Sequence, residues 1–270
     1  MMNDLVRFSA RPKLKSPVML AAWPGIGNVA TIVAIYLKRE LEFKRLAELD
    51  APYFFDPIGV SVRDNLVEAP QFPESSFYYF KNKGGANDII LFIGDDQPAA
   101  KGYELANCVL DVAEKYQVER VYTCAAAMTR IHHTEQPRVW AVATNAGAIG
   151  DLKKYDLIQG GELQIAGLNG LLLGVAKERG MEGVCLLGEV PSYATRVQNP
   201  IAALAVIKVL CKMLSIEIDL ADLARLAVEA RDKMKQMAAQ AMEEYIDFFT
   251  EPIWERGEEG EGEEGDEEDE

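Results

Sequence analysis

The chain has 270 residues, of which 49% are hydrophobic and 26% are charged, and its formal net charge is −15. This length suits one large α/β domain or two small domains. The acidic balance, with no cluster of basic residues, argues against nucleic-acid binding. No apolar run reaches the roughly 18–20 residues that a membrane-spanning helix needs, so we expect a cytoplasmic protein that makes no membrane contact.

The first 16 residues are polar and predict an arm or an edge strand. The apolar run Val18–Trp23 then predicts a strand, and apolar residues at steps of three and four predict a helix over Ile26–Glu40. A tight turn with two glycines, Trp23–Asn28, joins these two elements. Because glycine tolerates backbone conformations that other residues avoid, this strand–turn–helix unit is the central feature of the sequence.

Strands and helices alternate through the rest of the body. Strands are expected at 43–49, 66–68, 77–80, 88–94, 121–127, 139–144 and 183–189, and helices at 99–116, 148–155, 165–179 and 200–214. The run Asp88–Gly94 is almost entirely apolar, as in a parallel strand that is buried on both faces. The alternation predicts a three-layer α/β domain over residues 17–218, with a mostly parallel sheet and helices on both faces.

A long C-terminal helix is expected within 219–250. Leu220, Leu223, Ala227, Ala230, Met234, Met237 and Ala241 follow alternating spacings of three and four, as in a helix-packing seam. The seam fits either the chain's own domain or a partner subunit. Residues 257–270 hold ten acidic residues and no basic ones, a composition typical of a disordered tail.

The glycine turn is the first candidate site. Gly25, Ile26, Gly27 and Asn28 begin a G-x-G-x-x-A pattern between a strand and a helix, and Asp50 follows twenty residues after Ala30. That is the context of a dinucleotide fingerprint. Free amides at the turn could bind an anion or simply cap the helix.

Other candidate ligand-binding residues lie where strands end or glycines cluster. Asp95, Gln97 and Glu189 follow predicted strands, at the edge where open α/β sheets place their sites. The alternative is a structural role, in which Asp95 and Asp96 cap the next helix and hydrogen-bond the turn that precedes it. Gly160 and Gly161 precede a glycine-rich helix, whose glycines fit either close backbone packing or a ligand.

The sequence predicts no catalytic residue, metal site or cofactor. His132 and His133 are the only histidines, and they are predicted to lie in a polar surface loop. No cysteine forms a clear catalytic pair with either of them. Cys108, Cys124, Cys185 and Cys211 each lie in an apolar run and form no C-x-x-C motif, so we expect reduced core residues.

Several motifs together resemble the PAC2 family, which includes the eukaryotic proteasome assembly chaperone 2 and archaeal and bacterial relatives. The resemblance covers about residues 16–215 and rests on four motifs in order: Trp23–Asn28, Gly94–Pro98, Ile165–Leu173, and Gly188–Tyr193 followed by Asn199–Ala203.

The resemblance implies one domain like the purine nucleoside phosphorylase and hydrolase class, often trimeric. It implies a non-enzymatic assembly chaperone or protein-binding module, related to the proteasome. The alternative is an enzyme or binder for a nucleoside or phosphorylated metabolite, with its site at the rim of the sheet. The chain ends in Glu267–Glu270, whereas archaeal chaperones of this family often end in a hydrophobic residue, a tyrosine and a final residue. Docking by insertion of such an end is therefore not expected.

Overall fold

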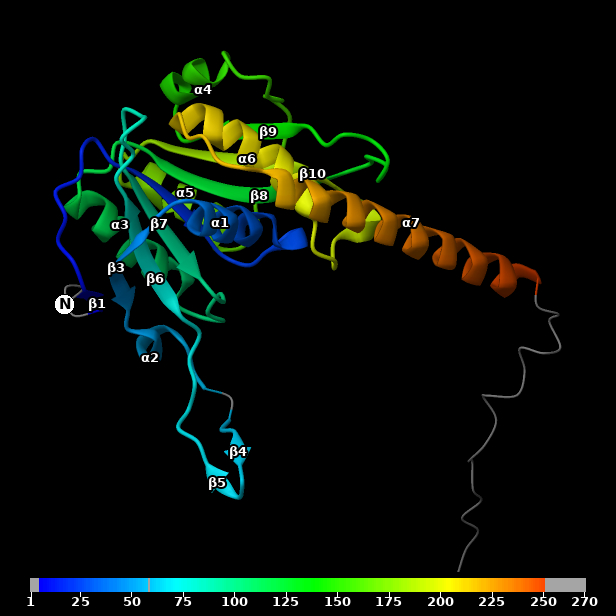
Figure 1. Cartoon of the computed structure of the whole chain (residues 1–270), viewed down its shortest axis with the longest axis horizontal. Helices are drawn as coiled ribbons and strands as arrows, with labels where there is room; N and C mark the ends of the chain where they lie inside the picture. Colours follow the sequence, from blue (N-terminus) through cyan, green and yellow to red (C-terminus); the bar gives the residue numbers. More distant parts are fainter. Residues whose placement is uncertain (1–4, 58, 251–270) are drawn as a thin grey trace, which may run out of the picture.

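The computed structural model describes residues 5–57 and 59–250. Its main sheet has eight strands in the order β1-β3-β6-β7-β2-β8-β10-β9. The strands are β1 Val6–Phe8, β2 Val18–Ala22, β3 Lys44–Leu49, β6 Ser75–Phe80, β7 Ile89–Gly94, β8 Val121–Thr129, β9 Val139–Ala143 and β10 Gly183–Pro191. A separate pair, β4 Val62–Arg63 and β5 Leu66–Val67, forms a hairpin arm that projects from the body (Figure 1).

The helices lie on both faces of the sheet (Figure 1). They are α1 Val29–Glu40, α2 Ala51–Phe54, α3 Gly102–Lys115, α4 Ala146–Leu152, α5 Leu168–Glu178, α6 Pro200–Leu214 and α7 Ala221–Thr250. The expected three-layer α/β architecture with a long C-terminal helix is confirmed. The sheet is mixed: β7, β2, β8 and β10 pair in parallel at its centre, and the outer pairs are antiparallel.

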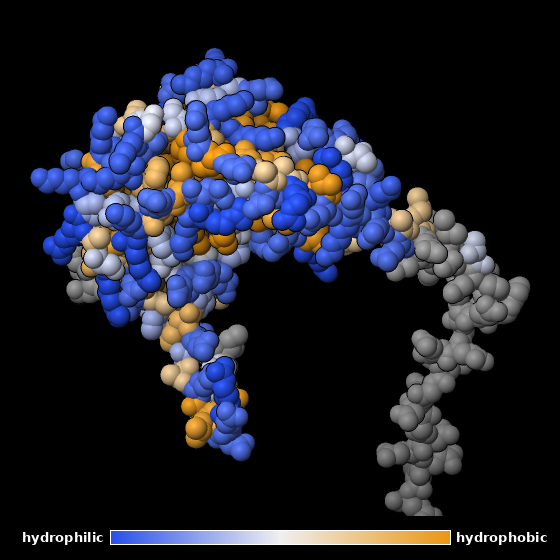
Figure 2. Space-filling model, viewed as in Figure 1, coloured by the Kyte–Doolittle hydropathy of each residue, from blue (hydrophilic) through white to orange (hydrophobic). Residues whose placement is uncertain are grey.

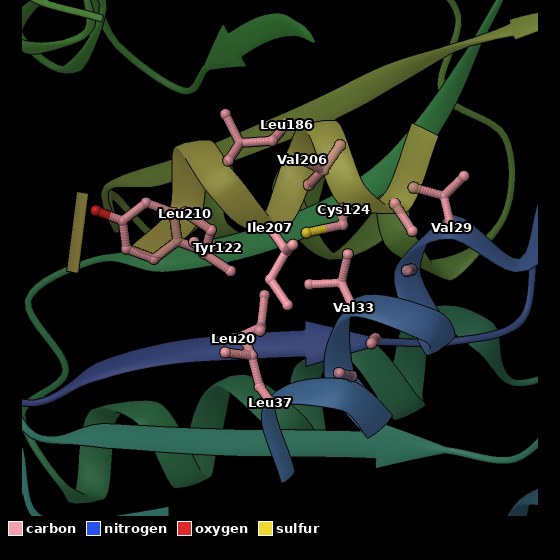
Figure 3. Packing of buried hydrophobic residues seen from close by; sticks show 14 of the residues in the cluster. Leu20, Val29, Val33, Leu37, Tyr122, Cys124, Leu186, Val206, Ile207 and Leu210 are labelled. Atoms are coloured by element: carbon pink, nitrogen blue, oxygen red, sulfur yellow. The ribbon is translucent and has the colours of Figure 1, made fainter. Parts of the chain in front are cut away.

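Strand β2 is apolar at every position because helices cover both faces of the sheet. Leu20 and Ala22 belong to the core beneath α1 and α6, whereas Met19, Ala21 and Trp23 belong to the core beneath α3 and α5. Successive side chains of a strand point to opposite faces, so a central strand covered on both faces must be apolar throughout. Figure 3 shows the first core, where side chains of α1 and α6 meet those of β2, β8 and β10.

The first half of α7 docks on its own domain. Leu223 packs with the core beneath α1 and α6, and Ala227 and Met234 are buried in a smaller cluster with Ile201. Further along, Met237 is 40% exposed and Met242 is 60% exposed. The predicted seam is therefore used by the chain itself up to Met234. The acidic segment 257–270 lies outside the described residues.

All four cysteines are free, buried thiols. No helix in the described part of the chain is long and apolar enough to cross a bilayer.

Candidate functional site

The parallel strands β2, β8 and β10 end at one edge of the sheet, and a hollow of about 430 Å³ opens there. Its wall combines the glycine turn, the end of β8 and the segment that precedes α5. The lining residues are Gly25, Ile26, Ala30, Gln97, Ala125, Ala126, Ala127, Met128, Glu162, Leu163, Gln164, Ile165, Ala166, Gly167, Asn169 and Leu187. We call this the rim hollow. It brings together three of the predicted site residues: Gly25, Ile26 and Gln97.

Gln97 links two walls of the rim hollow. Its Nε2 donates to the Pro24 carbonyl oxygen at 2.6 Å, and its Oε1 accepts a hydrogen bond from the Leu168 amide at 2.8 Å. Gly167 has a φ of +73°, and a Cβ there would lie 2.7 Å from Gln97 Oε1. Only glycine fits this close approach. The side chain predicted as a ligand contact is thus already engaged with the backbone on both sides.

Asn169 makes a similar bridge, and reasoning from sequence did not select it as a site residue. It is 4% exposed, and its side-chain amide binds the backbone of Trp23. The signal was present, because Asn169 is a polar residue between apolar neighbours at the start of a helix. A buried polar side chain of this kind must find hydrogen-bond partners.

Gly27 and Asn28 turn away from the rim hollow. The Gly27 amide donates to the Thr195 carbonyl oxygen at 3.3 Å, and the Gly27 carbonyl accepts from the Asn199 amide at 2.8 Å. The Asn28 amide donates to the Gly25 carbonyl oxygen at 2.9 Å. Both amides therefore have partners within the protein, so they do not form the open anion cradle of a nucleotide loop.

The dinucleotide alternative also requires an acidic residue beside the turn. Asp50 follows β3, which is separated from β2 by β6 and β7 in the sheet. Its carboxylate pairs with Arg7 at 2.6 Å. In a dinucleotide site that carboxylate would bind the ribose next to the glycine loop, so the arrangement differs from a dinucleotide fold.

Asp95 and Asp96 lie in the turn after β7 and are not helix caps. Asp95 accepts from the Glu74 amide at 3.3 Å, and Asp96 accepts from the Gln97 amide at 2.7 Å. The residue that precedes α3 is Lys101, with a left-handed backbone and no capping side chain. The helix-capping part of the alternative is therefore wrong, whereas Asp96 does bind an amide of its own turn and Asp95 binds the amide that precedes β6.

Gly160 and Gly161 lie in the loop that leads to the rim hollow. Their φ angles are +94° and +83°, which explains glycine at both positions. Neither lines the hollow; the wall starts at the next residue, Glu162.

Glu189 lies elsewhere, on the buried face of β10, and is 3% exposed. It accepts hydrogen bonds from the Arg138 amide at 2.9 Å and from the Arg138 guanidinium, and its other oxygen accepts from Trp140 Nε1 at 3.4 Å. Burial raises the pKa of Glu189, but the hydrogen bonds from Arg138 and Trp140 outweigh it and hold that pKa below its usual value. Glu189 is thus an ionised, paired carboxylate.

His133 is buried in the loop after β8, against Tyr193 and α7. The Tyr193 hydroxyl lies 3.0 Å from the His133 amide, which donates to it, and 2.9 Å from His133 Nδ1. Arg231 of α7 donates to the His133 carbonyl oxygen at 3.1 Å. His133 therefore anchors α7 to the domain. Its neighbours His132, Thr134, Glu135 and Gln136 are exposed, so the rest of the loop is the polar surface loop that the sequence predicts.

The described residues that line the rim hollow are mostly apolar, with the side-chain amides of Gln97, Gln164 and Asn169 among them. Glu162 is its only ionisable lining residue, and no serine, cysteine or histidine lines it. Among the residues that the structure describes, no group of three or more His, Cys, Asp or Glu side chains is arranged to hold a metal ion.

Comparison with known proteins identifies the family. The PAC2 family profile matches residues 19–238. An uncharacterized protein of Methanocaldococcus jannaschii is 28% identical over 220 residues, covering 79% of this chain and 80% of that protein.

Two solved structures from Pyrococcus furiosus are similar. PbaB, an archaeal proteasome activator, aligns with a TM-score of 0.72 and 29% identity over 86% of this chain and 98% of PbaB. PbaA, an archaeal homolog of proteasome-assembly chaperone, has the same fold, with a TM-score of 0.66 and 24% identity over 89% of this chain and 99% of PbaA. With its family match over most of the chain and this shared fold, the chain belongs to the PAC2 family.

Proposed function

We propose that this chain is a non-enzymatic protein-binding module of the assembly-chaperone type and that its partner is a proteasome-like complex. PAC2 membership and the likeness to a proteasome activator support the proposal. The composition of the rim hollow supports it as well, because that hollow carries no paired acid and base and no nucleophile.

One observation carries the proposal: the hairpin arm exposes apolar side chains. Val62, Leu66 and Val67 are 65–72% exposed, and Val60, just before the arm, is 51% exposed. Figure 2 shows hydrophobic residues on the surface of this arm, next to hydrophilic ones. The two strands pair only with each other, and a lone hairpin is marginally stable in water. An apolar projection of this kind is typical of a surface that contacts another protein.

The C-terminal helix offers a second contact. Its docked half is fixed by Leu223, Ala227 and Met234, whereas Met237 and Met242 remain exposed. Exposed methionines make adaptable contacts with a partner. The proposal includes a homo-oligomer, with a trimer favoured by resemblance, in the cytoplasm, where free thiols such as the four cysteines persist.

The test is co-sedimentation of the full chain with a purified archaeal proteasome core particle. We compare a double variant of the arm, Val62→Ser with Leu66→Ser, with a matched control, Ile35→Ser with Leu171→Ser. All four residues are exposed apolar side chains. The proposal expects the control to bind like the unchanged chain and the arm variant to lose most binding. Absence of binding by the unchanged chain, or equal binding by both variants, would refute it.

A second candidate function is a small-molecule site in the rim hollow, for a nucleoside or a phosphorylated metabolite. The observation that favours it is the 430 Å³ volume, which lies within the range of ligand pockets. A screen of nucleosides and nucleotides by thermal shift tests it. Binding should raise the melting temperature of the unchanged chain and not that of Ala126→Phe, which fills the hollow. No shift with any compound would count against this candidate.

A further inference from the structure

Two adjoining hollows lie at the edge of the sheet opposite the rim hollow, beside the β6–β7 turn. Their volumes are about 540 and 660 Å³, and they share Phe80, Asn82 and Gly84. We call the combined surface the lysine hollow. It is lined by Leu41, Glu42, Lys44, Tyr79, Phe80, Lys81, Asn82, Lys83, Gly84, Cys211, Lys212, Ser215, Ile216 and Glu217.

The backbone of the lysine hollow is held in place by Asn82. Its amide donates to Asp88 at 3.0 Å, and its side chain donates to the Leu214 carbonyl oxygen at 3.0 Å. Asn82 is 9% exposed. These bonds fix the β6–β7 turn against the end of α6, and Phe80 packs on Phe43 with ring centroids 5.6 Å apart. The surface is therefore preformed.

The charge of the lysine hollow is positive, on a protein whose net charge is −15. Lys44, Lys81, Lys83 and Lys212 are all exposed, and within the described part of the chain none of them forms an ion pair. Two glutamates, Glu42 and Glu217, partly offset them. Aromatic and aliphatic side chains, among them Tyr79, Phe80 and Ile216, line the same surface as the four lysines, so the surface suits an acidic peptide.

The chain itself supplies such a peptide. Its last 14 residues, Gly257–Glu270, hold ten carboxylates and no cation. We propose that the acidic segment Gly257–Glu270 of one copy binds in the lysine hollow of a neighbouring copy. Oppositely charged surfaces accelerate encounter and select partners, and an interaction of this kind weakens as salt screens the charges.

The length of α7 favours a neighbouring copy, and not the same chain, as the source of the acidic segment. Helix α7 begins four residues after Glu217 and contains 30 residues, which makes it about 45 Å long, and Figure 1 shows it extending away from the body. A fully extended chain covers at most about 3.3–3.6 Å per residue. About 13 extended residues would thus be needed to cover the length of α7 and bring the chain's own segment back to the lysine hollow. A neighbour's segment has no such restriction.

Zero-length carbodiimide coupling tests the proposal, because it joins lysines to carboxylates that are in contact. Equal amounts of unlabelled and ¹⁵N-labelled full chain are incubated together until their subunits have exchanged, and are then coupled and digested with trypsin. Cleavage after Arg256 releases 257–270 as one peptide. The proposal expects this peptide on Lys44, Lys81, Lys83 and Lys212, with about half of the coupled pairs combining the two isotopes, and several-fold less coupling at high salt.

A variant pair sharpens the test. Lys81→Gln with Lys83→Gln should reduce coupling at Lys44 and Lys212 several-fold, whereas Lys153→Gln with Lys154→Gln should leave it unchanged. All four lysines are exposed, so both variants should melt like the unchanged chain. Coupling that centres on Lys233 and Lys235 of α7, spreads evenly over all exposed lysines, or joins only chains of one isotope would overturn the proposal.

Discussion

The side-chain amide of Asn169 binds both backbone polar atoms of Trp23. The Trp23 amide donates to Asn169 Oδ1 at 3.0 Å, and Asn169 Nδ2 donates to the Trp23 carbonyl oxygen at 3.0 Å. This pairing ties the end of β2 to the first turn of α5 across 146 residues of sequence. Both partners are buried, so the contact is a structural joint beneath the rim hollow.

Removing that joint should destabilise the fold. Asn169→Leu leaves the buried amide and carbonyl of Trp23 without partners, and each unsatisfied group costs about 1–3 kcal/mol. We expect the free energy of unfolding in urea to fall by about 2–5 kcal/mol. Asn107→Leu is the control, because Asn107 is only half-buried. Its side chain donates to the Tyr103 carbonyl oxygen in its own helix and accepts from the Arg179 guanidinium, so no buried backbone group loses its partner. Equal, small losses for both variants would contradict the assignment.

Two glycines in α5 should respond in opposite directions to alanine. A Cβ at Gly170 would lie 2.1 Å from the Ile165 carbonyl oxygen, whereas a Cβ at Gly174 would meet nothing within 4 Å. Gly170→Ala must displace backbone and should cost more than about 2 kcal/mol. Gly174→Ala should stabilise the chain by about 0.5–1 kcal/mol, the ordinary advantage of alanine in a helix. Urea titrations of the two single variants decide this, and destabilisation by both would be inconsistent with the packing.

Asn28 tests the glycine turn. Its φ is +50°, and its side chain makes no capping hydrogen bond. Asparagine tolerates this left-handed conformation better than alanine does. We therefore expect Asn28→Ala to cost about 1–2 kcal/mol and Asn28→Gly to cost less. Thermal unfolding of both variants measures the difference. If Asn28→Ala is as stable as Asn28→Gly, the backbone argument fails.

His133 should make stability depend on pH. Burial lowers the pKa of His133, and the neighbouring charges of His132, Lys235 and Arg231 lower it further. As pH falls below about 6.5, the unfolded chain takes up a proton that the folded chain resists. Stability is therefore full above that pH and declines as pH falls toward the folded-state pKa.

The matched variants are His133→Asn and His132→Asn. Asparagine at 133 keeps an acceptor near Tyr193 but cannot titrate, so the fall in melting temperature between about pH 7 and pH 5 should become smaller. His132 is exposed, so its variant should keep most of the pH dependence. An unchanged pH profile in His133→Asn would show that another group is responsible.

Much of the fold could be predicted from the sequence because its periodicities are strong. The run Ile89–Gly94 is buried at every position, as its apolar composition indicates. The helix expected from Ile165 begins instead at Leu168, because Gly167 takes a positive φ that interrupts the helix. Of the two strands in the hairpin arm, the sequence predicts only the second, at 66–68. The first, Val62–Arg63, is too short to give a periodic pattern.

The site was harder to predict because it depends on long-range contacts. The position of Gly25 and Gln97 at one rim follows from strand ends meeting at one edge of the sheet. Glu189 is expected to end a strand, yet β10 continues to Pro191 and the Glu189 side chain binds Arg138 and Trp140. Which face a side chain takes depends on register, and register is a property of the assembled sheet.

Native mass spectrometry of the full chain mixed with an archaeal proteasome core particle shows whether this chain binds the proteasome. It reports, in one spectrum, how many copies associate, whether the core particle is bound and whether a small molecule is retained. We expect a homo-oligomer bound to the core particle, with no retained small molecule, and loss of this complex in the Val62→Ser with Leu66→Ser variant. A chain that leaves the core particle unbound and carries the mass of a nucleoside or nucleotide would show that it is a small-molecule binder and not a proteasome-binding module.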